Sequence, residues 1–128
     1  MREMRTTLLI SLLTALLLCA FALPAFTAPE APAGPVEFKV PEGIKVTKSM
    51  SPFTHDNHKM DCVECHHKWD GASDVQPCSA SGCHDQDGKK EATSFYKAFH
   101  DMKSKHSCLG CHRAEKKGPV SCNDCHPK

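Results

Sequence analysis

The sequence predicts a small fold, mostly irregular and α-helical, with a short N-terminal β-hairpin and a core filled by a bound group. The chain has 128 residues and nine cysteines, and large apolar side chains are sparse beyond the first 28 positions. The helical patterns are short, and eight of the cysteines fall into four motifs of one design. A domain this small is marginal on side-chain burial alone, so disulfides, metals or a cofactor usually supplement its core.

The N-terminal segment, residues 1–27, is predicted to be a signal peptide. Met1, Arg2 and Arg5 give it a positive start, residues 8–18 are largely apolar, and small residues follow. The apolar run is short for a bilayer span, so we expect no membrane anchor after cleavage, with a retained anchor as the alternative. Residues 28–35 are rich in proline and predict a flexible leader. Residues 36–128 are expected to form one domain.

The charge of the predicted mature chain excludes one class of partner. Loss of Arg2, Arg5 and Glu3 leaves 14 basic and 14 acidic residues. A near-neutral polypeptide lacks the basic surface of a nucleic-acid-binding protein. We therefore expect no nucleic acid among its partners.

Each cysteine beyond Cys19 belongs to a pair that is followed at once by a histidine. Three pairs have the spacing Cys-x-x-Cys-His, the attachment signature of c-type haem, and the second pair has four intervening residues. The pairs are Cys62 and Cys65, Cys78 and Cys83, Cys108 and Cys111, and Cys122 and Cys125. Two cysteines can form thioethers with the two vinyl groups of one haem, which holds the adjacent histidine beneath the iron. The sequence thus predicts four covalent haem c groups and a haem-filled core.

Two other kinds of site could use these cysteines. Paired cysteines with histidines can bind zinc, and eight cysteines in an exported chain can form four disulfides. Neither explains why a histidine follows every pair, so haem attachment is favoured.

The histidines predict how the irons are ligated. Four of the nine follow the cysteine pairs and would be proximal ligands, namely His66, His84, His112 and His126. Five others could supply the sixth ligands, namely His55, His58, His67, His100 and His106. The predicted mature chain has three methionines as competitors. This supply favours bis-histidine ligation, and therefore low potentials, because Met/His ligation raises them.

His66 and His67 are neighbours, which limits the distance between two haems. If both bind iron, with adjacent Cα atoms about 3.8 Å apart and a reach of roughly 6 Å each, the irons lie at most about 16 Å apart. Adjacent ligands would thus hold two haems close enough for rapid electron exchange.

The expected secondary structure is sparse. Apolar residues alternate with polar ones at Val36, Phe38 and Val40, and at Ile44 and Val46 after a Pro-Glu-Gly turn, which predicts a β-hairpin. A short helix capped by Thr54 is expected to carry His55 and His58.

Two further helices are expected in the second half of the chain. The longer begins at 93 or 94 and ends near 105, and the other covers 108–117 until Gly118-Pro119 stops it. The apolar stripe of the longer helix consists of Phe95, Phe99 and Met102.

Several segments together carry a resemblance to a known family. They are Phe-Thr-His-Asp-Asn-His at 53–58, Cys-Val-Glu-Cys-His-His at 62–67, the long motif at 78–84, Tyr-Lys-Ala-Phe-His at 96–100, and the last two motifs. On these segments the chain resembles the class III c-type cytochromes, the tetrahaem cytochrome c3 proteins of sulfate-reducing bacteria, so a cytochrome c3-like fold is expected. The fourth motif departs from the pattern, because many members have four residues between these cysteines.

The resemblance implies which histidine lies across each iron. The implied pairs are His55 with His66, His67 with His84, His58 with His112, and His100 with His126. Phe53 matches an aromatic residue that lies between haems in the family.

The resemblance also implies a function without a catalytic site. The chain would be a periplasmic electron shuttle that accepts electrons from a periplasmic hydrogenase and passes them to membrane-associated cytochrome complexes in sulfate respiration. A multihaem reductase, which needs an open iron position, and a unit of a larger haem assembly stay open as alternatives. Three roles are open for His106: a ligand in place of His100, a group that titrates near Cys108, or none.

Overall fold

The structure, a computed structural model, describes residues 11, 13, 14 and 29–128. The predicted signal peptide lies outside the described residues except at three positions. Within the part that is described, no helix combines the length and apolar character needed to cross a bilayer.

A two-stranded antiparallel sheet lies near the start of the domain, but its second strand is not the predicted one. Strand β1 (Pro35–Val36) pairs with β2 (Phe53–Thr54), with Val36 opposite Phe53. Residues 44–46 carry no strand, and the Ile44 N–H donates to the Pro41 carbonyl in a turn (3.2 Å). The predicted alternation is present in burial over 35–40, because Val36, Phe38 and Val40 are half-buried whereas Pro35, Glu37 and Lys39 are exposed. The prediction was wrong about the partner of β1, which is β2 and not the nearer segment 44–46.

Strand β2 leads directly into the first histidine-bearing turn. Thr54 caps the 3₁₀ helix η1 (His55–Asn57), and its side chain accepts a hydrogen bond from the Asp56 N–H at 3.1 Å. His58 follows at the end of this turn. The expected short helix is therefore present, as a single 3₁₀ turn. A second 3₁₀ helix, η2 (Cys62–Glu64), contains the first cysteine of the first motif.

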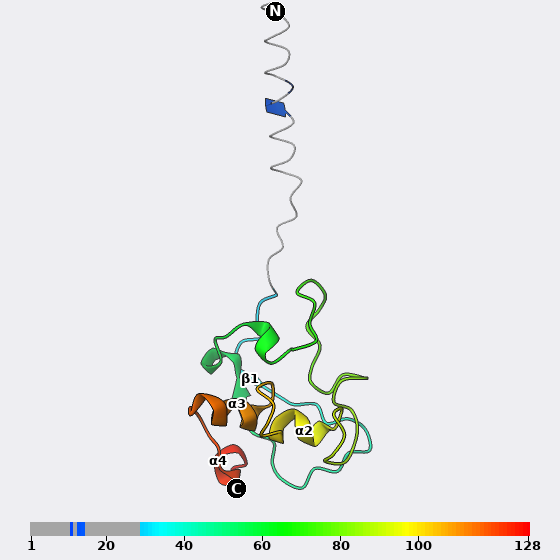
Figure 1. The fold of residues 1–128 in the computed structure, drawn as a ribbon, viewed down its shortest axis with the longest axis vertical. Coiled ribbons are helices and arrows are strands. Elements are labelled where there is room, and N and C mark those ends of the chain that lie inside the picture. Colours follow the sequence, from blue (N-terminus) through cyan, green and yellow to red (C-terminus); the bar gives the residue numbers. More distant parts are fainter. Residues whose placement is uncertain (1–10, 12, 15–28) are drawn as a thin grey trace, which may run out of the picture.

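Helices α2 (Phe95–His100) and α3 (Cys108–Glu115) pack against each other, as Figure 1 shows, with α4 (Cys122–Cys125) close to the C-terminus. Ser94, which is fully buried, caps α2 and donates to the Gly88 carbonyl at 2.6 Å.

Helix α2 is shorter than predicted. It ends before Asp101, whose side chain accepts a hydrogen bond from the Lys103 N–H at 3.0 Å and so stabilises a turn. Met102 consequently leaves the helical stripe and is 61% exposed.

Helix α3 begins close to the loop that follows α2, and a glycine permits this contact. Ser107 caps α3, donating to the Asp101 carbonyl at 2.5 Å and accepting from the Gly110 N–H at 3.0 Å. A Cβ atom on Gly110 would lie 2.1 Å from the Ser104 carbonyl oxygen. Only glycine fits this approach without moving the backbone.

The described residues form almost no apolar core of their own. Phe95, at 5% exposure, is the one large apolar side chain that is buried among them. The nearest equivalent of a core is a row of aromatic contacts: Phe53 to Phe38 at 5.7 Å, Phe38 to Phe99 at 5.0 Å and Phe99 to Phe95 at 5.1 Å. The predicted fold class is confirmed: a few short helices, one small sheet and mostly irregular chain.

Candidate haem sites

The four cysteine motifs share one local geometry despite their different lengths. In the first and fourth motifs the histidine N–H donates to the carbonyl of the first cysteine, His66 to Cys62 at 2.8 Å and His126 to Cys122 at 2.9 Å. The longer second motif closes in the same way, His84 to Cys78 at 3.0 Å, with its extra residues looped out. The third motif lies within α3. Each motif thus brings its cysteines and histidine together around one turn.

Cysteines of different motifs lie near enough to influence one another electrostatically. None of the eight described cysteines forms a disulfide. Desolvation raises the pKa of the Cys108 thiol to about 11, and the thiols of Cys78, Cys65 and Cys125 add to this effect. Since each of these four residues comes from a different motif, one cysteine from each of the four motifs lies in the same part of the fold.

Three of the four predicted histidine pairs face each other across a gap of uniform width. The ring centroids are 6.1 Å apart for His58 and His112, 6.0 Å for His67 and His84, and 6.0 Å for His100 and His126. With a metal–nitrogen bond of about 2.0 Å and about 1.2 Å from that nitrogen to the ring centre, two imidazoles on opposite sides of one metal have centroids about 6.3 Å apart. The spacing therefore fits one iron between each pair.

The fourth predicted pair, His55 and His66, shows no ring contact of this kind among the described residues. The His55 ring instead meets Phe53 edge-on at 5.1 Å. The Phe53 ring also lies 4.6 Å from the His58 ring, so it contacts two predicted ligands.

Backbone carbonyls fix the orientation of four predicted ligands. The Nδ1 atoms of His58, His66, His100 and His126 lie 2.6–3.0 Å from the carbonyl oxygens of Thr54, Gln76, Tyr96 and Ser49. An Nδ1–H that donates to a carbonyl leaves the Nε2 lone pair free, which is the usual arrangement of a metal-binding histidine.

Three further ring nitrogens are buried without a hydrogen-bond partner, the Nδ1 atoms of His55, His84 and His112. Buried polar atoms normally have a partner, so these Nδ1 atoms are places where an ordered water would complete the hydrogen bonding. Beside His112 a surface pocket is lined by Arg113, Lys116, Gly118 and Val120.

Two residues that help to shape these sites were not predicted from the sequence. The Tyr96 ring stacks on His100 at 4.2 Å, and their i, i+4 spacing on one helix was the available signal. Gly118, at φ +83°, approaches the His112 ring so closely that a Cβ atom would lie 2.3 Å from Nδ1.

The ring that lies opposite His126 is that of His100, not that of His106. The His106 ring stacks on His67 instead, with centroids 4.8 Å apart. Partial desolvation lowers the pKa of His67, and the neighbouring His106 and His84 add to this effect.

A conventional metal site is not present in the described part of the chain. No three His, Cys, Asp or Glu side chains there are grouped closely enough to hold one ion. The donors are instead arranged as opposed histidine pairs with cysteine thiols nearby. This is the set of ligands and attachment points that a c-type haem needs.

Comparison with known proteins agrees with this donor set. The class III cytochrome C family matches residues 32–126. The chain is 56% identical to cytochrome c3 of Desulfovibrio desulfuricans over 101 residues, which cover 77% of this chain and 98% of that protein. It is 52% identical to cytochrome c3 of Maridesulfovibrio salexigens over 105 residues, which cover 77% of this chain and 97% of the relative.

Solved structures give the same result. Cytochrome c3 from Desulfovibrio desulfuricans Essex 6 superposes with a TM-score of 0.61 and 38% identity, covering 78% of this chain and all of that one. The chain therefore belongs to the class III cytochrome c family, whose members are multihaem electron-transfer proteins with covalently attached haem c.

Proposed function

We propose that the chain binds four haem c groups, one at each cysteine motif, and ligates every iron with two histidines. The observation that carries this proposal is the equal spacing of 6.0–6.1 Å in three histidine pairs. The proximal ligands are the four motif histidines, and the distal ligands are His55, His58, His67 and His100. The tetrahaem domain comprises residues 36–128.

This ligation makes the protein a carrier of electrons. When bound, each haem supplies an iron that gains and loses one electron. The opposed histidines would ligate each iron on both sides, and the backbone carbonyls at Nδ1 of His58, His66, His100 and His126 keep those rings in place. An iron ligated in this way would offer substrate no binding position. The function is thus electron transfer at low potential, since both ligands are histidine.

The arrangement of ligands along the chain also supports rapid exchange between haems. His66 and His67 are consecutive yet serve different haems, His67 facing His84 of the second motif. His55 and His58 likewise would serve the first and third haems, and both rings contact Phe53. Electrons that enter at one haem therefore redistribute over a closely packed set.

In the cell, the proposed role is that of a periplasmic shuttle. It takes electrons from a periplasmic hydrogenase and delivers them to membrane-associated redox complexes of sulfate respiration. The family membership and the signal-like segment 1–27 support this role.

The proposal is tested on holoprotein purified from a host that attaches c-type haem. Electron paramagnetic resonance of the oxidised protein should give only low-spin signals that integrate to four haems, and hydrogenase under hydrogen should reduce all of them. A high-spin signal from one haem, together with turnover of nitrite or hydroxylamine, would indicate a reductase instead.

A further inference from the structure

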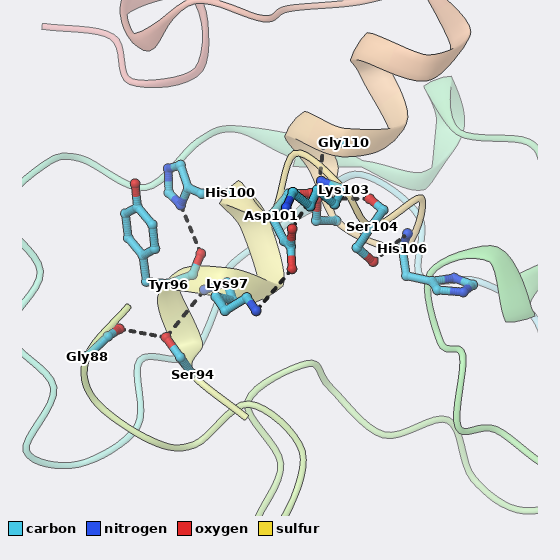
Figure 2. A network of polar contacts seen from close by, with 11 residues as sticks. Gly88, Ser94, Tyr96, Lys97, His100, Asp101, Lys103, Ser104, His106 and Gly110 are labelled. Atoms are coloured by element: carbon cyan, nitrogen blue, oxygen red, sulfur yellow. Dashed lines mark hydrogen bonds and ion pairs between the residues drawn. The ribbon is translucent and has the colours of Figure 1, made fainter. Parts of the chain in front are cut away.

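His106 lies in the loop between α2 and α3, and its ring is tied to a distant part of the chain. Its Nδ1 lies 2.8 Å from the carbonyl oxygen of Glu64, 42 residues earlier and within the first cysteine motif. Its backbone N–H donates to the Ser104 side chain at 3.2 Å. Figure 2 shows the ring projecting away from the loop and the contact with Ser104. His106 is thus held by two contacts, its backbone N–H to Ser104 and its ring nitrogen to Glu64.

The anchored ring lies almost parallel to His67. The two centroids are 4.8 Å apart and the planes differ by 21°, a stacked arrangement. His67 in turn faces His84 at 6.0 Å. His106 is therefore in direct contact with a proposed iron ligand without being one of the opposed pairs.

His67 lacks the restraint that His58 and His100 have. Those two residues each direct Nδ1 at a backbone carbonyl, that of Thr54 and that of Tyr96 respectively. In the region that the structure describes, the His67 ring has no hydrogen bond, and its side chain is exposed. Outer partners normally set the rotation of a ligating imidazole, and the His106 ring stacks on His67 where it can do so.

We propose that His106 is a positioning residue for His67. By stacking, it fixes the rotation of the His67 ring about the bond to iron and covers one face of that ring against water. The proposal rests on the proposed bis-histidine ligation of the haem attached at Cys78 and Cys83. The hydrogen bond to Glu64 holds the stacking ring in place and ties this distal ligand to the first motif.

A spectroscopic signature distinguishes positioning from a merely structural role. In a low-spin ferric haem, the plane of an axial imidazole sets the direction of the half-filled iron orbital. That direction determines the pattern of paramagnetic shifts of the four haem methyl groups. A freed His67 would change this pattern for the second haem alone.

Four variants of the holoprotein provide the test. His106→Ala removes the ring, His106→Gln keeps a donor for Glu64 without a ring, and His106→Phe keeps the ring without the donor. Lys105→Ala, at an exposed neighbouring position, is the matched control. The readouts are the number of low-spin haems, the haem methyl NMR shifts assigned to each haem, and the four potentials.

We expect all variants to keep four low-spin haems. His106→Ala and His106→Gln should lose the wild-type methyl pattern of the second haem and lower its potential, because water then reaches the ligand and favours the ferric iron. His106→Phe should keep most of the pattern, and Lys105→Ala should be unchanged. If His106→Ala fails to assemble, the comparison of His106→Gln with His106→Phe still decides the matter.

Three results would overturn the inference. An unchanged second-haem pattern in His106→Gln would show that the stack does not orient His67. Equal losses in His106→Phe and His106→Gln would assign the effect to something other than stacking. A high-spin haem in His106→Ala would make His106 a ligand itself. Failure of the proposed function is separate, since it would appear in the wild-type protein as fewer than four low-spin haems.

Discussion

At the scale of single residues, the space around each ligand is set by small side chains as well as by the ligands themselves. Helix α3 ends at Lys116 in a left-handed conformation (φ 53°), and the chain then turns so that Gly118 passes over the His112 ring. A side chain at 118 would occupy the position of that ring.

We therefore predict that Gly118→Ala displaces His112 and abolishes the low-spin signature of one haem. Gly43→Ala is the matched control, because Gly43 has a similar φ of +81° but open space around it. Both variants carry a left-handed strain of about 1–2 kcal/mol, so the difference between them isolates the contact with His112. Low-spin haem is counted by electron paramagnetic resonance. Equal counts in the two variants would refute this role of Gly118.

Half of the candidate ligands, the four proximal histidines, could be predicted from the sequence because their signal is local. A histidine next to a cysteine pair, such as His66 or His112, is identified by spacing alone. Gly118 and the stack of His106 on His67 could not be predicted in this way. Both depend on how separate turns of the chain pack against each other, and no short sequence pattern specifies that packing.

At the scale of elements, the irregular segments are held by side-chain caps. The loop 70–73 is an example, because the Asp70 carboxylate accepts hydrogen bonds from the Ala72 N–H, the Ser73 N–H and the Ser73 hydroxyl at 2.8–2.9 Å. These bonds lower the pKa of Asp70 from 3.8 to about 2.

The lowered pKa predicts an acid-sensitive loop. The carboxylate is favoured in the folded chain, so its contribution is complete above the ordinary value of 3.8 and is lost as the pH falls toward 2. The amide NMR signals of Ala72 and Ser73 should shift over this range in the wild type, and the transition should be absent in Asp70→Asn. Asp74→Asn serves as the control and should keep it. A wild-type transition centred at or above 3.8 would contradict the account.

The cap of α3 is the second element that can be tested. Ser107 is 3% exposed and bonds both Gly110 and Asp101, so Ser107→Ala removes a cap and takes one of its donors from the half-buried Asp101 carbonyl. We predict a loss of about 1–2 kcal/mol in the free energy of unfolding. Ser121→Ala, at the exposed start of α4, should lose less. Denaturant unfolding followed by circular dichroism measures both, and equal losses would argue against a special role for Ser107.

The boundaries of the helices could be predicted where a capping residue or a stop signal lies next to them in the sequence. Ser94, Thr54 and the Gly118-Pro119 stop all mark boundaries close to those observed. The prediction of a second strand at 44–46 was wrong. Strand β1 pairs with β2 across a long connection, and the alternation at 44–46 carries no information about that partner. The end of α2 was missed because Asp101 forms a local turn that competes with the helix.

At the scale of the whole molecule, the polypeptide alone does not account for its compact form. Phe95 is the only large apolar side chain buried within the described residues, whereas three histidine pairs lie at the spacing expected of two ligands on one iron. The fold class could be predicted because this shortage of core residues is evident in the composition. The pairing of ligands followed from family resemblance, since distal and proximal histidines are far apart in the chain.

The central claim is that four covalently bound haems supply the interior that the side chains do not. The most direct test is the intact mass of the denatured, purified protein, compared with the mass calculated for the polypeptide from its sequenced N-terminus. We predict an excess of about 2.5 kDa, the mass of four haems retained through thioether bonds. A protein that folds natively yet shows the mass of the polypeptide alone, or of eight cysteines joined in disulfides, would contradict the account.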